Sequence, residues 1–289
     1  MAATAAGEQG PLALVCGGGS LPLAVADMVA ARGRKVVLFP LRGAANPGDF
    51  ADRPHHWIYA GQVGRFVRLV RSAGCRDIVF LGSMVRPSIW QIHADWKSVT
   101  LLPRILAAFR GGDNHLLSGI ARLVEQQGFR VSGAHEVAPE ILVPQGALGR
   151  ARPSAHDQAD IALGLDYLAA AGPFDIGQAV VVAGKHILAV EAIEGTDEML
   201  GRVAELRANG RLRAPAGGGV LVKAPKPDQD RRFDLPSIGP QTVERVARAG
   251  LAGIAVAAGS TIVAEPERLV QAADRANIFV VGVGTGTGR

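Results

Sequence analysis

The stretch LALVCGGGSLP, residues 12–22, decides the fold that we expect for this chain. Its first five residues are apolar, enough for one buried strand, and an amphipathic segment continues from its end to Ala31. Glycines between a strand and a helix let backbone N–H groups approach an anion, and the helix N-terminus favours the negative charge. The stretch therefore predicts a strand–loop–helix unit with a phosphate-binding loop that contains Gly18, Gly19 and Ser20.

The same arrangement recurs further along the chain. Residues 55–60 are predicted as a short strand that leads into Gly61-Gln-Val-Gly64, and the buried strand 77–81 leads into Gly82-Ser-Met-Val-Arg-Pro87. The glycine spacing matches neither the dinucleotide fingerprint nor the P-loop, and residues 41–46 after the strand at 35–40 contain no acid to hold a ribose, which disfavours an NAD site. Because parallel strands end at one edge of their sheet, we expect a nucleotide or phosphate site there. Its further members are Gln62, Gly82, Ser83 and Arg86.

The composition fits an α/β protein of two domains. The chain has 289 residues, of which 48% are hydrophobic and only 5% aromatic, typical of repeated strand–helix units packed on small side chains. We expect a Rossmann-like nucleotide- or phosphate-binding domain at residues 1–135 and a proline-containing junction at 136–150. A second α/β domain with the acidic motifs is expected at 151–283, followed by a flexible tail at 284–289.

Charge and cysteine content exclude several classes. The net charge is +5, but basic residues are interleaved with acids, which favours anionic ligands over nucleic acid. Cys16 and Cys75 have no partner motif for a disulfide or zinc. No apolar run reaches the roughly 20 residues of a membrane span, and we expect a cytoplasmic protein. Residues 90–109, which include Trp90 and Trp96, are predicted either as core or as a surface for acyl chains or a membrane.

Two polar motifs lie in the second half. VEAIEGTD, residues 190–197, follows an apolar strand and brings Glu191, Glu194, Thr196 and Asp197 to its carboxyl end. KAPKPDQDRRFDLPSIG, residues 223–239, contains three prolines among dense mixed charges and is predicted to be a shaped loop. The simpler interpretations, a helix cap for the first motif and a solvated loop for the second, stay open.

Taken together, the motifs resemble one known family. The glycine loops, Asp175-Ile-Gly-Gln178, residues 190–197 and residues 226–239 are similar to the UDP-2,3-diacylglucosamine pyrophosphatases of lipid A synthesis. The resemblance implies two α/β domains with the ligand site between them, and a homodimer. It also implies Mg²⁺-dependent hydrolysis, with Mn²⁺ as an alternative, to UMP and 2,3-diacylglucosamine 1-phosphate by water attack on the α-phosphorus. The chain departs from the pattern at Asp228 and at Asn114-His115.

The resemblance also suggests roles for particular residues. Asp230, Lys226 and Lys223 are the expected catalytic residues, and Gln178, Thr196 and Gln229 are added to the substrate-binding residues. The expected metal ligands are Asp230, Glu191, Glu194 and Asp197; the sequence leaves open which of them bind metal and which could act as a base. Peripheral contact with the inner membrane is expected from the lipid substrate. The alternatives are a nucleotide-sugar or phospholipid sensor without hydrolysis and, less favoured, a nucleotide-dependent oxidoreductase.

Overall fold

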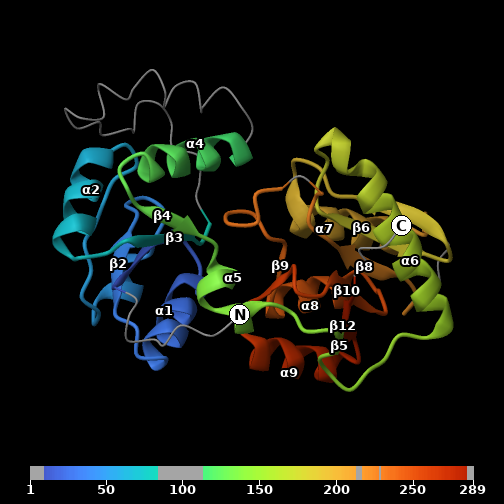
Figure 1. Ribbon diagram of the computed structural model, residues 1–289. Coiled ribbons are helices and arrows are strands. Elements are labelled where there is room, and N and C mark those ends of the chain that lie inside the picture. Colours follow the sequence, from blue (N-terminus) through green and yellow to red (C-terminus); the bar gives the residue numbers. More distant parts are fainter. Residues whose placement is uncertain (1–9, 84–112, 213–216, 228, 285–289) are drawn as a thin grey trace. The chain divides into compact units, whose positions relative to one another are not determined.

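The computed structural model describes residues 10–83, 113–212, 217–227 and 229–284 (Figure 1). The chain divides into two compact units: Met1–Pro139 with Asp230–Asp234, and Glu140–Gln229 with Leu235–Arg289. The short segment 230–234 therefore belongs to the first unit, whereas the predicted division places it in the second. The side chains of residues 113–117 lie outside the description, as do Arg86, Asp228 and the tryptophan-containing segment 90–109.

The first unit is built on a four-stranded parallel sheet in the order β2-β1-β3-β4. Its strands are β1 (Leu12–Cys16), β2 (Val36–Pro40), β3 (Asp77–Leu81) and β4 (Arg130–Ser132). All five residues of β1 are buried, as expected for a strand with helices on both faces of its sheet. The helices are α1 (Leu21–Ala31), η1 (Pro47–Phe50), α2 (Val63–Ser72), α4 (Asp113–Glu125) and α5 (Ala134–Val137).

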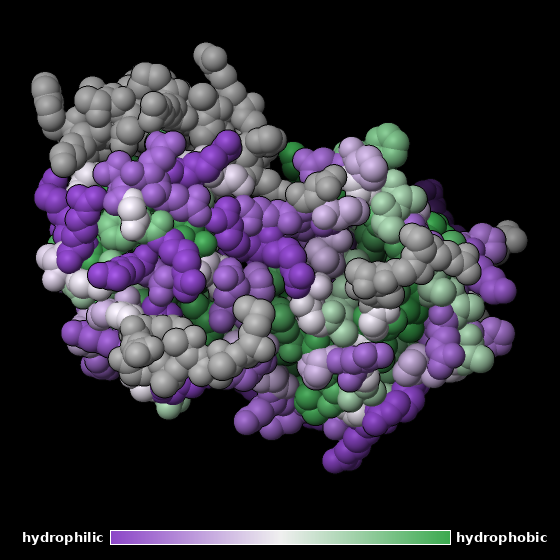
Figure 2. All heavy atoms as spheres, viewed as in Figure 1, coloured by the Kyte–Doolittle hydropathy of each residue, from purple (hydrophilic) through white to green (hydrophobic). Residues whose placement is uncertain are grey.

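The core of this unit lies between the sheet and its helices. Phe39 of β2 meets Phe66 of α2 edge to face, with ring centroids 5.2 Å apart. Both cysteines are buried free thiols, and burial raises the pKa of Cys16 to about 12. On the face drawn in Figure 2, hydrophilic side chains dominate the described surface of the first unit, because its helices turn their apolar faces inward.

The second unit contains a six-stranded mixed sheet in the order β5-β12-β10-β8-β6-β7. β8 (Val220–Lys223), β10 (Gly253–Ala257) and β12 (Phe279–Val283) are parallel, whereas β6 (Ala179–Ala183) runs antiparallel to both of its neighbours, β8 and β7 (His186–Val190). A separate pair joins β9 (Ser237–Ile238) to β11 (Ile262–Val263). The helices are η3 (Pro139–Ile141), α6 (Ala155–Ala171), η4 (Gly172–Phe174), α7 (Gly195–Ala208), α8 (Pro240–Arg248) and α9 (Pro266–Ala276).

These two units confirm the predicted α/β class. The predicted junction at 136–150 is not a free linker, since β5 (Gly146–Ala147) pairs antiparallel with β12 in the second sheet. Among the described helices, none is both long and apolar enough to span a membrane. The glycine loops after β1 and β3 and the motif at 223–239 follow the carboxyl ends of parallel strands, where open α/β sheets bind their ligands. The motif at 190–197 instead follows β7, which pairs antiparallel with β6.

Candidate functional site

The glycine loops after β1 and β3 are joined to each other. Gly18 N donates to Ser83 O at 2.8 Å, and Ser83 N donates back to Gly18 O at 3.0 Å. A Cβ on Gly17 would lie 2.4 Å from Ser83 O, and one on Gly82 would lie 2.7 Å from Gly18 O, so glycine is required for this close approach. The two loops therefore occupy one place at the carboxyl edge of the first sheet.

The loop turns into α1 at Gly19, whose φ of +94° lies in the left-handed region. No side chain caps the helix at Ser20, and its first turn holds no acid, so its backbone N–H groups and helix dipole suit an anion. Gln62 has a local contact: its Oε1 accepts from Tyr59 N at 3.4 Å and Arg65 Nη1 at 3.3 Å, at the start of α2. The structure thus groups five of the predicted phosphate-binding residues, which are Gly18, Gly19, Ser20, Gly82 and Ser83.

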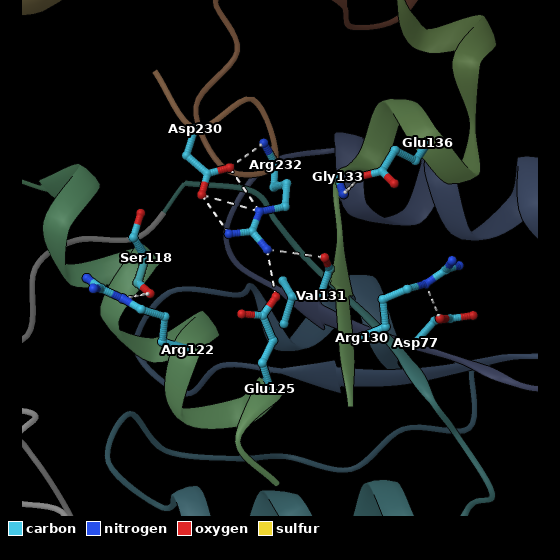
Figure 3. A network of polar contacts seen from close by, with 10 residues as sticks. All are labelled: Asp77, Ser118, Arg122, Glu125, Arg130, Val131, Gly133, Glu136, Asp230 and Arg232. Atoms are coloured by element: carbon cyan, nitrogen blue, oxygen red, sulfur yellow. Dashed lines mark hydrogen bonds and ion pairs between the residues drawn. The ribbon is translucent and has the colours of Figure 1, made fainter. Parts of the chain in front are cut away.

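Asp230 is held by an arginine in the first unit (Figure 3). Its Oδ1 accepts from Arg232 N at 3.1 Å and Arg232 Nε at 3.0 Å, and its Oδ2 accepts from Arg232 Nη2 at 2.8 Å. These hydrogen bonds are the main reason that the pKa of Asp230 is lowered; a hydrogen bond from Ser118 adds a smaller effect in the same direction. Asp230 is therefore a carboxylate at neutral pH.

The same arginine fastens segment 230–234 to the first unit. Arg232 Nη1 binds Glu125 Oε1 of α4 at 2.7 Å, and hydrogen bonding to Asp230 and Glu125 raises the arginine's pKa further above its usual value. Phe233 packs near Phe80 of β3, with ring centroids 6.0 Å apart. A Cβ on Gly133 would lie 3.1 Å from Arg232 Cα, so the missing side chain gives the segment room.

Two buried polar atoms lie on the β4 side of this segment. Ser132 Oγ and His135 Nδ1 have no hydrogen-bond partner in the described part of the chain. The imidazole lies against Gly133, where a Cβ would be 2.6 Å from Nδ1. Burial lowers the pKa of His135, the positive charge of Arg231 lowers it further, and Glu136 opposes this. His135 is therefore disfavoured as an imidazolium in the folded protein.

The second unit contains a polar cluster around a buried lysine. Lys223, at the end of β8, is 7% exposed, and its Nζ donates to Thr196 Oγ1 at 2.9 Å and Ser237 O at 3.1 Å. Thr196 Oγ1 donates to Glu191 Oε1 at 2.7 Å, and Glu191 Oε2 accepts from Gln178 N at 2.8 Å. Burial lowers the pKa of Lys223, while the charges of Glu191 and Asp197 oppose that shift. The structure thus brings four of the predicted site residues together.

Lys226 and Gln229 lie in the loop after β8. Lys226 Nζ pairs with Asp175 Oδ1 at 2.6 Å, and Lys226 N donates to Gln229 Oε1 at 3.0 Å. Gln229 is 9% exposed, and its Nε2 has no partner in the residues that the structure describes. The buried amide therefore accepts a hydrogen bond from the backbone of the loop, while its Nε2 has no partner among the described residues.

The predicted metal ligands each contact a different partner. Asp230 belongs to the first unit, whereas in the second Glu191 binds Thr196, Glu194 binds Arg202 at 2.8 Å and Asp197 binds Arg245 at 3.1 Å. Across the described residues, no three His, Cys, Asp or Glu side chains are grouped so that they could hold a metal ion. Mg²⁺, however, is commonly bound by one or two carboxylates together with substrate phosphates and water. Asp230 is ionised, and because both of its oxygens accept hydrogen bonds from Arg232, a cation there would share the carboxylate with the arginine.

Fold and site together define a two-unit α/β protein with glycine loops at the carboxyl edge of its first sheet and with grouped acidic and basic residues in both units. Two family models match the chain: the LpxI N-terminal domain at residues 11–141 and the LpxI C-terminal domain at residues 144–281. The chain belongs to the LpxI family, as the motifs predicted.

One curated relative is similar in sequence to this chain over almost its whole length. The UDP-2,3-diacylglucosamine pyrophosphatase LpxI of Caulobacter vibrioides is 42% identical over 273 residues, which cover 94% of this chain and 97% of the relative. Among solved structures, a GalE-like L-threonine dehydrogenase from Cupriavidus necator is 12% identical and covers 91% of this chain and 88% of its own, with a TM-score of 0.29. That score is too low to support a comparison of folds.

Sequence reasoning expected Arg232 and its neighbours to keep Asp230 ionised, but it missed the contacts that hold this segment in the first unit. Arg232 is adjacent in the motif, but Glu125 lies 107 residues away from it in the sequence and carries no motif of its own. Ser132 ends the short strand β4 and His135 lies in the short helix α5, and neither stands in a distinguishing sequence pattern. Only the three-dimensional packing of segment 230–234 brings these side chains together.

Proposed function

We propose that the chain hydrolyses the pyrophosphate of UDP-2,3-diacylglucosamine to UMP and 2,3-diacylglucosamine 1-phosphate. The observation that carries this proposal is the 42% identity to a UDP-2,3-diacylglucosamine pyrophosphatase over 94% of the chain. Water attacks the α-phosphorus and adds its oxygen to UMP. The bond from the α-phosphorus to the bridging oxygen breaks, and that oxygen leaves with the sugar phosphate. One proton of the water must be taken up by a base or by solvent.

Asp230 is assigned to cation binding rather than to proton transfer. A general base works best with a pKa near the working pH, whereas hydrogen bonds from Arg232 hold the pKa of Asp230 below its ordinary acidic value. A carboxylate that stays ionised suits a hard cation. Mg²⁺ bound there would supply positive charge to the phosphate oxygens as negative charge develops.

The two lysines of the 223–239 motif are assigned different roles, and only Lys226 is assigned to the phosphates. Lys226 carries a charge that is shared with Asp175 through the 2.6 Å ion pair, and an anionic oxygen can compete for it because Asp175 is 77% exposed. Lys223 is buried and hydrogen-bonded, so we assign it to positioning Thr196 and, through it, Glu191. The loops at Gly18 and Ser83 are assigned to anion binding in the first unit.

The decisive assay measures UMP release from purified protein and UDP-2,3-diacylglucosamine, with EDTA and after adding Mg²⁺ or Mn²⁺. Release that EDTA abolishes and Mg²⁺ restores supports the proposal. In H₂¹⁸O the label should appear in UMP; label in the sugar phosphate would place attack on the other phosphorus. Binding without release would favour the sensor, and turnover of a nicotinamide cofactor would favour the oxidoreductase.

Two further parts of the proposal concern assembly and location. We propose a homodimer in solution and peripheral contact with a membrane surface, because the substrate carries acyl chains. Light scattering of the purified protein tests the first. Sedimentation with anionic vesicles, with and without the substrate, tests the second.

A further inference from the structure

A hollow of about 790 Å³ opens in the first unit, at the edge of the sheet where the strands begin. Asp77 and Arg130, the first residues of β3 and β4, are register partners, and both line the hollow together with Arg76 and Phe129. The other lining residues have no side chain to fill the space; they are Gly10, Gly74 and Gly128. Small-molecule sites have volumes of about 300–1,000 Å³, so the hollow has the size for such a ligand.

One carboxylate in this hollow is shared by two arginines. Asp77 is the one acid among the described lining residues, and its Oδ1 accepts from Arg130 Nε at 2.7 Å. Its Oδ2 pairs with Arg34, whose side chain is 8% exposed. Figure 3 shows the contact between Arg130 and Asp77 separate from the network around Asp230. The pairing therefore leaves one of the two guanidinium charges without a counter-charge.

Two exposed arginines keep hydrogen-bond donors for a further anion. The side chain of Arg76 makes no hydrogen bond or ion pair with any residue that the structure describes, and Arg130 uses only its Nε within that part of the chain. The two backbones are adjacent, because Arg130 N donates to Arg76 O at 2.9 Å. With Arg34 included, three arginines surround one aspartate, and the cluster has two positive charges in excess. Guanidinium groups with free N–H pairs bind phosphate oxygens two at a time.

We propose that this hollow binds the phosphoryl group of a small phosphorylated molecule, at a site distinct from the glycine loops. A phosphoryl dianion matches the excess of two positive charges and can accept hydrogen bonds from both Arg76 and Arg130. The glycine loops lie at the other end of the same strands. β1 alone separates the two edges by roughly 13 Å, at about 3.3 Å per residue, so one phosphate cannot contact both. The inference does not depend on the proposed hydrolysis.

The number of available charges favours a small ligand over a polyanion. Nucleic acids and anionic bilayers are held by several basic side chains that act together along an extended surface. Here Arg34 is buried and paired, so only Arg76 and Arg130 are exposed cations among the described residues of the cluster. Inorganic phosphate, a sugar phosphate and a phospholipid headgroup offer the same phosphoryl chemistry, and the measurements must distinguish them.

The test follows the unfolding temperature of the full chain as ligand is added, because a ligand that binds the folded state raises this temperature. The probes are inorganic phosphate and glucose 6-phosphate, with chloride at equal ionic strength as the reference. In Arg76→Gln with Arg130→Gln, the apparent Kd for both probes should rise at least about tenfold, because a hydrogen bond to a charged group contributes about a factor of ten or more. Arg68→Gln with Arg248→Gln removes the same charge from exposed positions outside the hollow and should bind as the wild type does.

The same variants separate this site from the proposed function. Stabilisation by phosphate that only the Arg76–Arg130 variant loses supports the site, whether or not the wild type releases UMP. In phosphate-free buffer this variant should release UMP near the wild-type rate. Phosphate binding that the variant keeps would place the anion elsewhere, such as at the glycine loops, and would overturn the proposal. So would equal weakening in the Arg68–Arg248 variant, which would indicate a general effect of charge.

A lipid source is distinguished by sedimentation with vesicles that contain phosphatidic acid. Binding of the soluble probes, with equal sedimentation of the wild type and the Arg76–Arg130 variant, supports a small soluble ligand. Sedimentation that the variant loses, without binding of either soluble probe to the wild type, would assign the arginines to a bilayer and overturn the proposal.

Discussion

Asp230 and Asp27 both bind an arginine through two oxygens, and this makes them a matched pair for mutation. Asp27 binds Arg53 at 2.5 and 3.0 Å on the exposed surface of the first unit, whereas Asp230 lies in the polar motif at residues 223–239. We expect Asp230→Ala to slow turnover at least about a hundredfold, and Asp27→Ala to leave it near the wild-type rate. The measurement is kcat at saturating substrate over several Mg²⁺ concentrations. Near-normal turnover of the Asp230 variant would remove that residue from the mechanism.

Arg232 determines the pH range in which Asp230 is ionised. Because the arginine lowers the pKa of this carboxyl group, its loss should let that pKa rise. The carboxylate would then be lost at a higher pH, and we expect Arg232→Gln to move the acid limb of the kcat/KM profile upward. Arg122→Gln, on the exposed face of α4, is the control. An unshifted acid limb with a merely lower rate would indicate a structural role for Arg232 alone.

His135 should make stability depend on pH in the weakly acidic range. Its pKa in the folded protein lies below the value of about 6.5 that an unfolded chain has, so folding favours the neutral imidazole. This stability is fully present above that value and is lost as pH falls through the folded-state pKa, because the unfolded state binds the proton first. Urea unfolding at pH 7.5 and 5.5 should show a smaller loss for His135→Gln than for the wild type. An equal loss would contradict the assignment.

At the scale of single elements, one buried carboxylate joins α6 to the hairpin between β6 and β7. Asp160 is 3% exposed and accepts from Gly184 N at 2.9 Å and Lys185 N at 2.6 Å. Lys185 has a φ of +61°, so the turn itself is strained and needs these bonds. We expect Asp160→Ala to lower the free energy of unfolding by about 1–3 kcal/mol, because two backbone N–H groups of the turn lose their charged hydrogen-bond acceptor. Urea denaturation beside Asp166→Ala, an exposed position on α6, checks this.

Local sequence patterns predicted the helices and strands better than the pairing between strands. The strands at 12–16 and 77–81 and the helix that ends at Ala31 are confirmed, since apolar periodicity and glycines are local signals. Residues 55–60, predicted as a strand, form only isolated bridges to β2 and its end, at His55 and Ile58. The pairing of β5 with β12 was missed, because an antiparallel edge strand of two residues has no periodicity to detect. Contacts across a long sequence separation leave no pattern in either partner.

In the whole molecule, residues that are close in the sequence do not always belong to the same unit. The chain passes between the two units at 139–140, at 229–230 and again at 234–235, so three connections join them. The middle segment places Asp230 and Arg232 against α4 and β4 of the first unit. The predicted sites at Lys226 and Asp230, four positions apart in one motif, therefore belong to different units.

Because the chain passes between the two units three times, its two halves are poorly suited to exchange by recombination. A gene cut between the two matched family regions, after residue 141, would encode a first half that lacks the five residues that bind Glu125 and pack near Phe80. A chimaera that joins this half to the second half of a relative would receive a foreign copy of those residues. In such a hybrid, compatibility would depend on how the donor's 230–234 sequence suits the recipient's α4 and β3. The two halves of the gene are therefore not independent, because residues 230–234 are encoded by the second half and belong to the first unit.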